Sequence, residues 1–220
     1  MATFEIRKFQ DGDAEAVKEI FALGMGELVP SSFSHILKQP LTQMVLMCTF
    51  CALLTSSKSF LLPILALTLL LASVRQVLTY VINRATESAM RSDLSDITES
   101  YLTQKDSCFW VAESDGRVVG SVACVPSENT PECLELKRMS VHPSHRGMGI
   151  AKALCRTVAE FTQDRGYAAV HLHTSMVATN AQKLYEHYGF EKIKEAVAPG
   201  FLAKITNFTL IEYKLHLKRS

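Results

Sequence analysis

The sequence predicts an α/β fold built on a mixed sheet, with an apolar helical hairpin inserted near its start. Segments with the two-residue alternation of strands are interleaved with amphipathic segments of helical period, which is typical of mixed α/β domains. A long apolar stretch separates the first strand and helix from all the others. The 220 residues suffice for one domain with a buried core and an accessory segment, but a two-domain enzyme is not expected.

The first two elements precede the apolar stretch. Phe4, Ile6 and Phe9 lie in an alternating segment that predicts a strand. Residues 13–29 have a helical, amphipathic pattern that starts with the acidic Asp13.

The apolar stretch predicts membrane helices. Lys58 is the only formally charged residue in the sequence from Leu41 to Val74, and the apolar character continues to Asn83. One crossing needs about 20 apolar residues, so residues 41–83 suit two crossings or a re-entrant hairpin that breaks at TSSKS, residues 55–59. The alternative is a very hydrophobic helix pair buried inside a soluble protein.

The flanks of this stretch bear on its topology. If the first strand joins the same sheet as the later ones, both ends of the hairpin must emerge on one side. Lys38 before the stretch and Arg75 and Arg84 at its end favour the cytosolic side, whereas Lys58 at the tip disagrees.

The remaining elements follow in a mixed order. Two strands joined by the turn SDG form a predicted hairpin. The predicted elements are strands at 108–113, 117–125 and 134–141, a helix at 150–165, a strand at 168–174, a helix at 178–188, and strands around 190–196 and 208–217.

Composition excludes several classes of function. The net charge is +1 and the charges are interspersed, so a nucleic-acid partner is not expected. Met1 to Gln10 is polar and alternating and does not resemble a secretory signal peptide, so the six cysteines are expected to be free thiols. Cys48 and Cys51 form a CxxC pair inside the apolar run, without a second pair or a histidine nearby, and are expected to be lipid-facing or packed thiols rather than a metal or redox site.

A glycine-containing loop lies between a predicted strand and helix. Its sequence is RGMGIA, residues 146–151, and such a loop directs backbone N–H groups and a helix dipole at one point, which suits a pyrophosphate. A Rossmann fingerprint would need a third glycine where Lys152 stands, and a Walker loop would end in Gly-Lys-Ser/Thr. Taken alone, the pattern is also typical of an ordinary turn.

The residues that flank the loop make its interpretation more specific. The run from Met139 through His142-Pro143 to RGMGIA resembles the acetyl-CoA loop of the GCN5-related N-acetyltransferases, and residues 180–190, NAQKLYEHYGF, are similar to that superfamily's second motif, NxxAxxLYxxxGF. With the inserted hairpin, IRKFQ near the start and residues 95–120, the whole chain resembles the camello-like (N-acetyltransferase 8) family of membrane-bound members.

This resemblance implies the fold and the cosubstrate. We expect one N-acetyltransferase domain over 1–220, with the membrane hairpin at 41–83 and the main acetyl-CoA-binding and catalytic part at 92–217. Its twisted mixed sheet, with flanking helices, would splay into a V between the fourth and fifth strands. Acetyl-CoA is the implied cosubstrate, and no metal is expected.

The resemblance also implies roles for individual residues. Met139 and Val141 would contact the pantetheine through the main chain, Arg146 would cap the loop, and Asn180 would bond the cofactor or cap its helix. The amides that would hold the pyrophosphate belong to Gly147, Met148, Gly149, Ile150 and Ala151.

Direct acetyl transfer needs a neutral amine, an oxyanion donor and an acid for the departing thiolate. Tyr185 occupies the position of the superfamily's acid, although a packed aromatic is the alternative. Glu135 matches a glutamate that deprotonates the amine through water in some members, and the alternative is a solvated rim carboxylate. His171 and His173 alternate on one strand face and are either substitute bases or structural histidines. A metal is not expected there, because no carboxylate or cysteine accompanies them at ligand spacing.

Two further charges precede the loop. Lys137 and Arg138 should point to opposite faces of their strand, so one of them is available to an anionic acceptor. The alternative for both is a solvated charge.

The predicted function is a membrane-anchored N-acetyltransferase that acetylates a primary amine. Within the resembled family we favour the α-amine of cysteine S-conjugates, because such amphiphilic acceptors concentrate at a membrane. Protein lysines of the secretory pathway are one alternative, and a silent acetyl-CoA-binding membrane protein in adhesion or trafficking is another. The resemblance implies the endoplasmic reticulum, the intermediate compartment or the Golgi membrane, with the catalytic part in the cytosol where acetyl-CoA is supplied. Apolar hairpins often associate, so an oligomer stays open.

Overall fold

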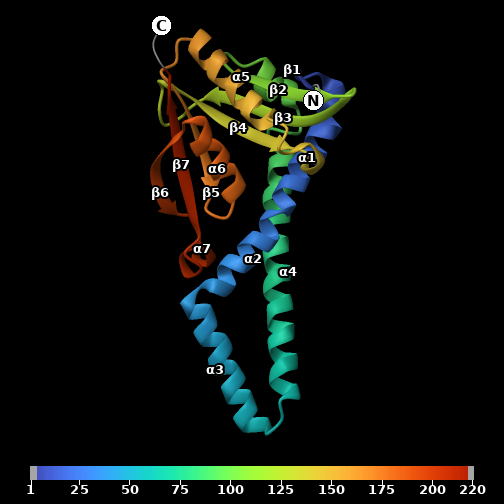
Figure 1. Cartoon of the computed structure of the whole chain (residues 1–220), viewed down its shortest axis with the longest axis vertical. Helices are drawn as coiled ribbons and strands as arrows, with labels where there is room; N and C mark the ends of the chain where they lie inside the picture. Colours follow the sequence, from blue (N-terminus) through green and yellow to red (C-terminus); the bar gives the residue numbers. More distant parts are fainter. Residues whose placement is uncertain (1–3, 218–220) are drawn as a thin grey trace. The chain divides into compact units, whose positions relative to one another are not determined.

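The computed structural model describes residues 4–217, which contain a seven-stranded mixed sheet in the order β1-β2-β3-β4-β5-β7-β6 (Figure 1). All neighbouring strands are antiparallel except β4 and β5, which are parallel. The strands are β1 (Phe4–Lys8), β2 (Cys108–Ser114), β3 (Arg117–Pro126), β4 (Cys133–Val141), β5 (Ala169–Ser175), β6 (Glu191–Val197) and β7 (Thr209–His216).

Helices occur in both halves of the chain. The chain divides into two compact units, one of Met1–Gly24 with Thr86–Ser220 and one of Met25–Ala85. The helices are α1 (Ala14–Gly26), α2 (Leu28–Lys38), α3 (Pro40–Ser57), α4 (Leu61–Arg91), α5 (Ile150–Asp164), α6 (Thr179–Tyr188) and α7 (Phe201–Ile205), with short turns η1 (Asp11–Asp13), η2 (Thr98–Leu102) and η3 (Pro143–His145).

The first strand belongs to the same sheet as the later ones. β1 pairs antiparallel with β2 from Phe4 opposite Ser114 to Lys8 opposite Trp110. Arg7 reinforces this join, because its guanidinium donates to both oxygens of Asp13 at 2.7 and 2.8 Å and to Glu113 at 2.7 Å. The condition stated for the topology of the inserted segment is therefore met, because the chain leaves the sheet after β1 and returns to it at β2.

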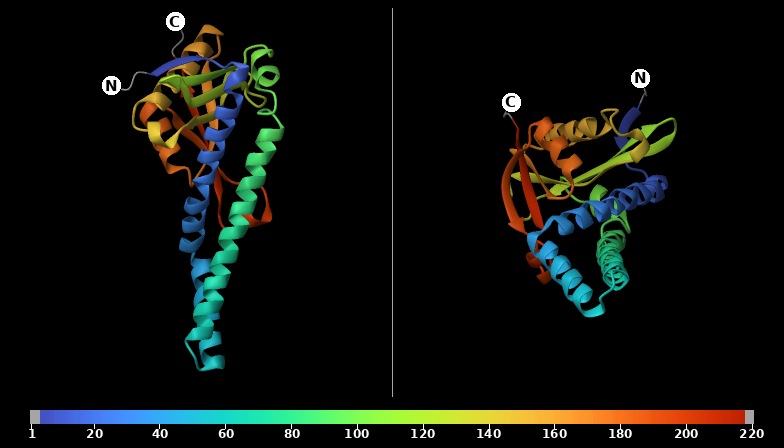
Figure 2. Two further views of the ribbon diagram at one scale, coloured as in Figure 1. Left: turned by 90° about the vertical axis from the view of Figure 1, so that its right-hand side faces the viewer. Right: turned by 60° about the horizontal axis from the view of Figure 1, so that its bottom comes forward.

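The two faces of the sheet are covered by different helices. α5 packs against β3, β4 and β5, and Figure 2 shows it on the face opposite to the start of α1. Val17, Ile20 and Phe21 of α1 are buried, at most 9% exposed. Gly120 of β3 allows α5 to approach closely, because a Cβ there would lie 3.2 Å from Ile150 and 3.3 Å from Leu154.

The sheet opens between β4 and β5. The two strands pair at Cys133, Leu134 and Glu135 of β4 and no further, although β4 continues to Val141 and β5 to Ser175. The predicted V between the fourth and fifth strands is confirmed, and Glu135 is the last residue of β4 that pairs before the strands part.

A bulge interrupts β4 on its other side. Ser121 of β3 pairs with Ser140 and Ala123 pairs with Lys137, so two residues of β4 lie opposite Val122. Leu136 and Met139, three residues apart, both pack against the core on the α5 side. The bulge therefore shifts the two-residue alternation by one position within this strand.

The second unit holds the apolar helices. α3 ends at Ser57, its C-cap Lys58 has a left-handed φ of 53°, and α4 begins at Leu61, so the predicted break at residues 55–59 is confirmed. Three helical stretches are long and apolar enough to cross a membrane: Asp11–Lys38, Pro40–Ser57 and Leu61–Arg91. The first of these begins with the residues of α1 that are buried against the sheet, so its start is part of the folded domain.

Two predicted helix boundaries were wrong. The helix expected over residues 13–29 ends at Gly26, and a separate helix, α2, begins at Leu28. The second helix of the hairpin continues past Asn83 to Arg91, because the following residues, RATESAM, are compatible with a helix although they are not apolar.

Candidate active site

The glycine loop joins the end of β4 to the start of α5. Gly147 and Gly149 have φ values of 78° and 85°, in the left-handed region that favours glycine, and Gly149 is the N-cap of α5. Arg146 Nε donates to the carbonyl of Val141 at 3.1 Å, which ties the two ends of the loop together. The loop is exposed, and the first N–H groups of a helix have no intrahelical partner. This geometry suits a bound pyrophosphate.

The next candidates line the V below this loop. Met139 and Val141 pack their side chains against the core cluster. Both lie in the part of β4 that has no ladder to β5, so the strand has no β-sheet partner on that edge, although the Val141 carbonyl accepts the bond from Arg146 Nε. Ile150 is buried beneath the loop, and Met148 is 45% exposed above it.

Tyr185 lies in α6 and is 6% exposed. Its ring packs against Phe190 at 5.5 Å and Tyr213 at 6.1 Å between centroids. Burial and the nearby Cys155 raise the pKa of Tyr185 above its ordinary value, so its hydroxyl keeps its proton at neutral pH. The residue is thus a packed aromatic and also a protonated group of the kind a departing thiolate needs.

Asn180 lies in the first turn of α6 and is exposed. The alternative that it caps this helix was wrong, because the N-cap position is Ala178 and no side chain caps it. The contact to a cofactor stays a prediction.

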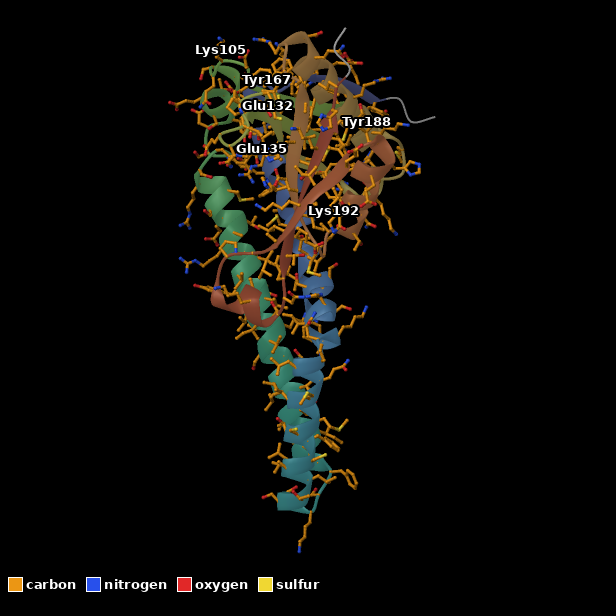
Figure 3. All side chains as sticks on the ribbon, turned by 90° about the vertical axis from the view of Figure 1, so that its left-hand side faces the viewer. Lys105, Glu132, Glu135, Tyr167, Tyr188 and Lys192 are labelled. Atoms are coloured by element: carbon orange, nitrogen blue, oxygen red, sulfur yellow. The ribbon has the colours of Figure 1, made fainter. Side chains whose placement is uncertain are left out.

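Glu135 belongs to a polar cluster on the sheet face away from α5. Its carboxylate is 21% exposed and lies 3.6 Å from His173 Nδ1 and 3.7 Å from Lys137 Nζ. In Figure 3, Glu135 lies at the start of β4, close to Glu132 and below Lys105. Glu135 is therefore neither a freely solvated rim residue nor a core residue, and it lies where the V begins.

The two histidines of β5 differ in their surroundings. His171 is 3% exposed, whereas His173 is 44% exposed, and their rings meet edge to face at 4.7 Å. Burial lowers the pKa of His171 and the neighbouring His173 lowers it further, while Glu135 and Glu212 act in the opposite sense. His171 is consequently neutral at physiological pH.

The expectation that Lys137 and Arg138 point to opposite faces of the strand was wrong. The bulge breaks the alternation that would send them there, and Arg138 is not a solvated charge. Arg138 pairs with Asp93 and stacks over the Phe21 ring at 5.1 Å, so its guanidinium is engaged within the domain. Lys137 is the one of the two that is exposed and next to Glu135.

A cavity of about 530 Å³ opens beside Lys137. Lys105, Glu128 and Tyr101 are among its other lining residues. It therefore presents two ammonium groups, Lys105 and Lys137, and two carboxylates, Glu128 and Asp93, of which Asp93 is paired with Arg138. Glu135 is two residues from Lys137 on the same strand.

Several residues near the site were not predicted. Glu212 on β7 lies directly opposite His173, and Asp93 pairs with Arg138 across 45 positions of sequence. The polar alternation of β7, Glu212, Lys214 and His216, shows that they share a face, but only the strand order reveals which histidines they meet. The sequence argument against a metal also fails in three dimensions, because β7 supplies a carboxylate beside the two histidines.

The parted strands, the glycine loop at a helix start and the buried tyrosine define an acyl-CoA-dependent acetyltransferase. In agreement, the model of the "Acetyltransferase (GNAT) family" matches residues 76–190, more than half of the chain. The chain is therefore an acetyl-CoA-dependent N-acetyltransferase, and the alternative of a silent acetyl-CoA-binding protein is set aside.

Within this class, the chain belongs to the N-acetyltransferase 8 family. It is 40% identical over 199 residues to N-acetyltransferase 8 of Rattus norvegicus, covering 89% of this chain and 90% of that protein. It is 38% identical over 220 residues to N-acetyltransferase 8B of Homo sapiens, covering 99% and 96%. The family resemblance seen in the sequence is confirmed.

Solved structures share the fold. An acetyltransferase of the GNAT family from Staphylococcus aureus Mu50 superposes with a TM-score of 0.57 at 18% identity, covering 98% of this chain and all of that one. An N-acetyltransferase from the same organism gives a TM-score of 0.52 at 15% identity over 99% of this chain. At these identities the likeness shows the fold alone.

Proposed function

We propose that this acetyltransferase acetylates the α-amine of an amphiphilic cysteine S-conjugate at a membrane surface. The observation that carries this proposal is the pair Glu135 and Lys137, 3.7 Å apart at the point where β4 and β5 part and beside a cavity of about 530 Å³. An anion to take a proton and a cation to bind a carboxylate are the two groups that an amino-acid acceptor requires.

In the proposed reaction, each group of the site has one role. Acetyl-CoA enters the V with its pyrophosphate on the amides of residues 147–151 and its pantetheine along Met139 and Val141. Glu135 takes a proton from the acceptor ammonium through water, or His173 does so in its place. The neutral amine then attacks the thioester carbonyl, a C–N bond forms, and the C–S bond breaks. Tyr185, which its raised pKa keeps protonated at neutral pH, donates its proton to the departing sulfur, and the second proton released by the acetylated nitrogen restores the tyrosine hydroxyl.

The acceptor would be held by its carboxylate. Lys137 and Lys105 both line the cavity, and an ammonium group binds a carboxylate as a compact point charge. A protein lysine side chain carries no carboxylate next to its amine, so these two lysines favour an amino-acid derivative over a peptide lysine.

The proposal also includes anchoring of the chain in a membrane. α3 is about 27 Å long and α4 is longer, which compares with about 30 Å for a hydrocarbon core. Because β1 and β2 belong to one sheet, we infer an even number of crossings or a re-entrant hairpin made of α3 and α4, with the 41–83 segment in contact with lipid. Arg84 and Arg91 near the end of α4, with Arg75 at its middle, support a catalytic part in the cytosol, on an endoplasmic reticulum or Golgi membrane.

The experiment is acetyl transfer by the detergent-solubilised full chain. The acceptors are S-benzylcysteine, S-benzylcysteamine, which lacks the carboxylate, aspartate and a lysine peptide. We expect S-benzylcysteine to be used with the highest kcat/KM and S-benzylcysteamine at least about tenfold less well, which is about 1.4 kcal/mol of transition-state binding.

Variants assign the effect to the cavity. Lys137→Ala should reduce kcat/KM for S-benzylcysteine and leave that for S-benzylcysteamine nearly unchanged, while Lys194→Ala on β6, an exposed lysine, is the matched control. Preference for the lysine peptide, or equal use of the two benzyl compounds, would contradict the proposed acceptor.

A further inference from the structure

Two histidines and a glutamate converge on the sheet face that carries Glu135. His171 and His173 alternate along β5 and so share a face, and Glu212 of β7 lies directly opposite His173 in the register. One ligand atom from each of the three lies within 4.8 Å of the others. From this convergence we propose a zinc-type metal site with His171, His173 and Glu212 as its protein ligands.

The separation between His171 and Glu212 matches a coordination shell better than a hydrogen bond. His171 Nε2 lies 3.5 Å from Glu212 Oε1, beyond the usual range of about 2.7–3.2 Å for an N–H···O bond. Ligands at about 2.0–2.1 Å around a tetrahedral zinc ion are about 3.3 Å apart. Small movements of two side chains thus suffice to close the site around an ion.

A second observation comes from His171 itself. This imidazole is 3% exposed, and its Nδ1 has no hydrogen-bond partner among residues 4–217. A buried polar nitrogen without a partner is destabilising. With Nε2 facing Glu212 only at 3.5 Å, the ring has no ordinary hydrogen bond to account for its burial, and a metal ion is a partner of the right chemistry.

The donor set indicates which ion is bound. Two imidazoles and one carboxylate suit zinc, and they leave a fourth position open. Glu135, 3.6 Å from His173 Nδ1 and opposite His171 in the register, lies where it reaches that position directly or through a metal-bound water. The nearby cations, Lys137 and Lys214, each lie within 4.0 Å of a glutamate other than Glu212.

The site has a consequence for catalysis that rests on the proposed role of Glu135 as the base. A carboxylate that coordinates the ion, or bonds its water, has its lone pairs engaged and no longer accepts a proton from the acceptor amine. Occupation of the site therefore inhibits acetyl transfer reversibly, and the apoprotein is the active form.

The test measures binding first, without reference to activity. The detergent-solubilised full chain, stripped with a chelator, is titrated with Zn²⁺ by calorimetry and with Co²⁺ by visible absorption, whose intensity reports tetrahedral coordination. We expect one ion per chain, and at least about tenfold weaker binding in His171→Gln and in Glu212→Gln. His216→Gln, an exposed histidine on β7, is the matched control and should bind as the wild type does.

Thermal unfolding of each variant without metal separates a lost ligand from a lost fold. If the wild type binds no ion, or if both ligand variants bind as tightly as the wild type while folded, the site does not exist.

Activity is measured second, with and without saturating Zn²⁺. Loss of transfer in the wild type and in His216→Gln, with Glu212→Gln spared at the same concentration, supports the inhibitory role. Stoichiometric binding with undiminished transfer would overturn inhibition and the assignment of Glu135 as the base. An active apoprotein that binds no ion would overturn the metal site alone and leave the proposed function standing.

Discussion

Asp93 and Arg138 form a two-point ion pair that joins the segment following α4 to the bulge of β4. Arg138 Nε lies 2.7 Å from one carboxylate oxygen of Asp93 and Nη2 lies 2.5 Å from the other. Tyr101 donates a further hydrogen bond to the same carboxylate, and Arg138 itself has a left-handed φ of 55°. The pair thus holds the bulged residue next to the strand that lines the V.

Removing one partner of this pair should destabilise the domain strongly. Both side chains are about three-quarters buried, at 23% and 24% exposure, so the remaining group would be left unpaired. We expect Asp93→Asn to lower the free energy of unfolding by about 3 kcal/mol, measured by urea denaturation in detergent. Glu160→Gln, which breaks the exposed pair between Arg156 and Glu160, is the control and should cost less than about 0.5 kcal/mol. Equal effects would mean that burial of the pair contributes nothing.

The same pair should give the domain an acid-sensitive stability. Burial alone would raise the pKa of Asp93, but the hydrogen bonds from Arg138 and Tyr101 outweigh it and hold the pKa below its usual range. A folded-state pKa below the unfolded value of about 3.9 contributes stability that is fully present above that value. This contribution is lost as the pH falls through the folded-state pKa.

The hydrogen bond from Arg7 likewise lowers the pKa of Asp13, so Asp13 also contributes stability that is lost in acid.

Because the pKa of Asp93 is lowered in the folded state, the difference in unfolding free energy between the wild type and Asp93→Asn should be constant from about pH 5 to 7 and shrink below about pH 4. A difference that grew on acidification would contradict this account of the pair.

Acetyl-CoA binding should depend on the backbone conformation of the loop. Gly149 has a φ of 85°, and a Cβ there meets nothing within 4 Å, so Gly149→Ala tests conformation rather than space. A residue other than glycine is destabilised by about 1–2 kcal/mol in this left-handed conformation. Relaxation of the strained backbone would move the amides of the loop away from the pyrophosphate. We expect acetyl-CoA affinity to fall about tenfold by calorimetry, whereas Gly12→Ala, also in open space, should leave it unchanged.

Tyr185 should matter for the rate and not for cofactor binding. Tyr185→Phe keeps the packing against Phe190 and Tyr213 and removes only the hydroxyl. We expect kcat to fall about 100-fold with unchanged acetyl-CoA affinity, whereas Tyr188→Phe on the same helix should retain most of the rate. Because burial raises the pKa of Tyr185, the wild type should show no loss of rate from tyrosine ionisation up to about pH 10. Undiminished kcat in Tyr185→Phe would show that another group protonates the sulfur.

Local sequence patterns predicted the elements of this fold well because their signals are local. Alternation located the strands, the glycines located the turn before α5, and the length of the apolar run located a break that the structure has at Lys58. Membership of the first strand in the same sheet was only a condition for the hairpin topology, and the pairing of β1 with β2 meets that condition.

The contacts of the site were not accessible in this way. The bulge of β4 inserts one residue into an otherwise regular alternation, and nothing in LKRMSV distinguishes it from a regular strand. Asp93 and Arg138 are far apart in sequence, and the cluster of Glu135, His171 and Glu212 exists only because β4, β5 and β7 are neighbours in the sheet. Residue types therefore predicted the chemistry, whereas strand order decided which groups meet.

The inserted hairpin should place its tip on the far side of the membrane if α3 and α4 both cross. Lys58 caps α3 in a left-handed conformation, and both helices expose large apolar side chains, including Leu41, Met44, Met47, Leu61, Ile64, Leu65 and Leu69. A glycosylation cassette flanked by long Gly/Ser spacers, inserted after Lys58, reports the location of the tip in microsomes.

We expect the cassette at Lys58 to be glycosylated and the same cassette at the C-terminus to remain unmodified, since the catalytic part is proposed to lie in the cytosol. A glycan at the C-terminus only would reverse the orientation. An unmodified tip, with a C-terminus that is also unmodified and a chain that resists alkaline extraction, would indicate a re-entrant hairpin. In that case Lys58 would return to the cytosolic interface, which would remove the conflict between its charge and the positive-inside rule.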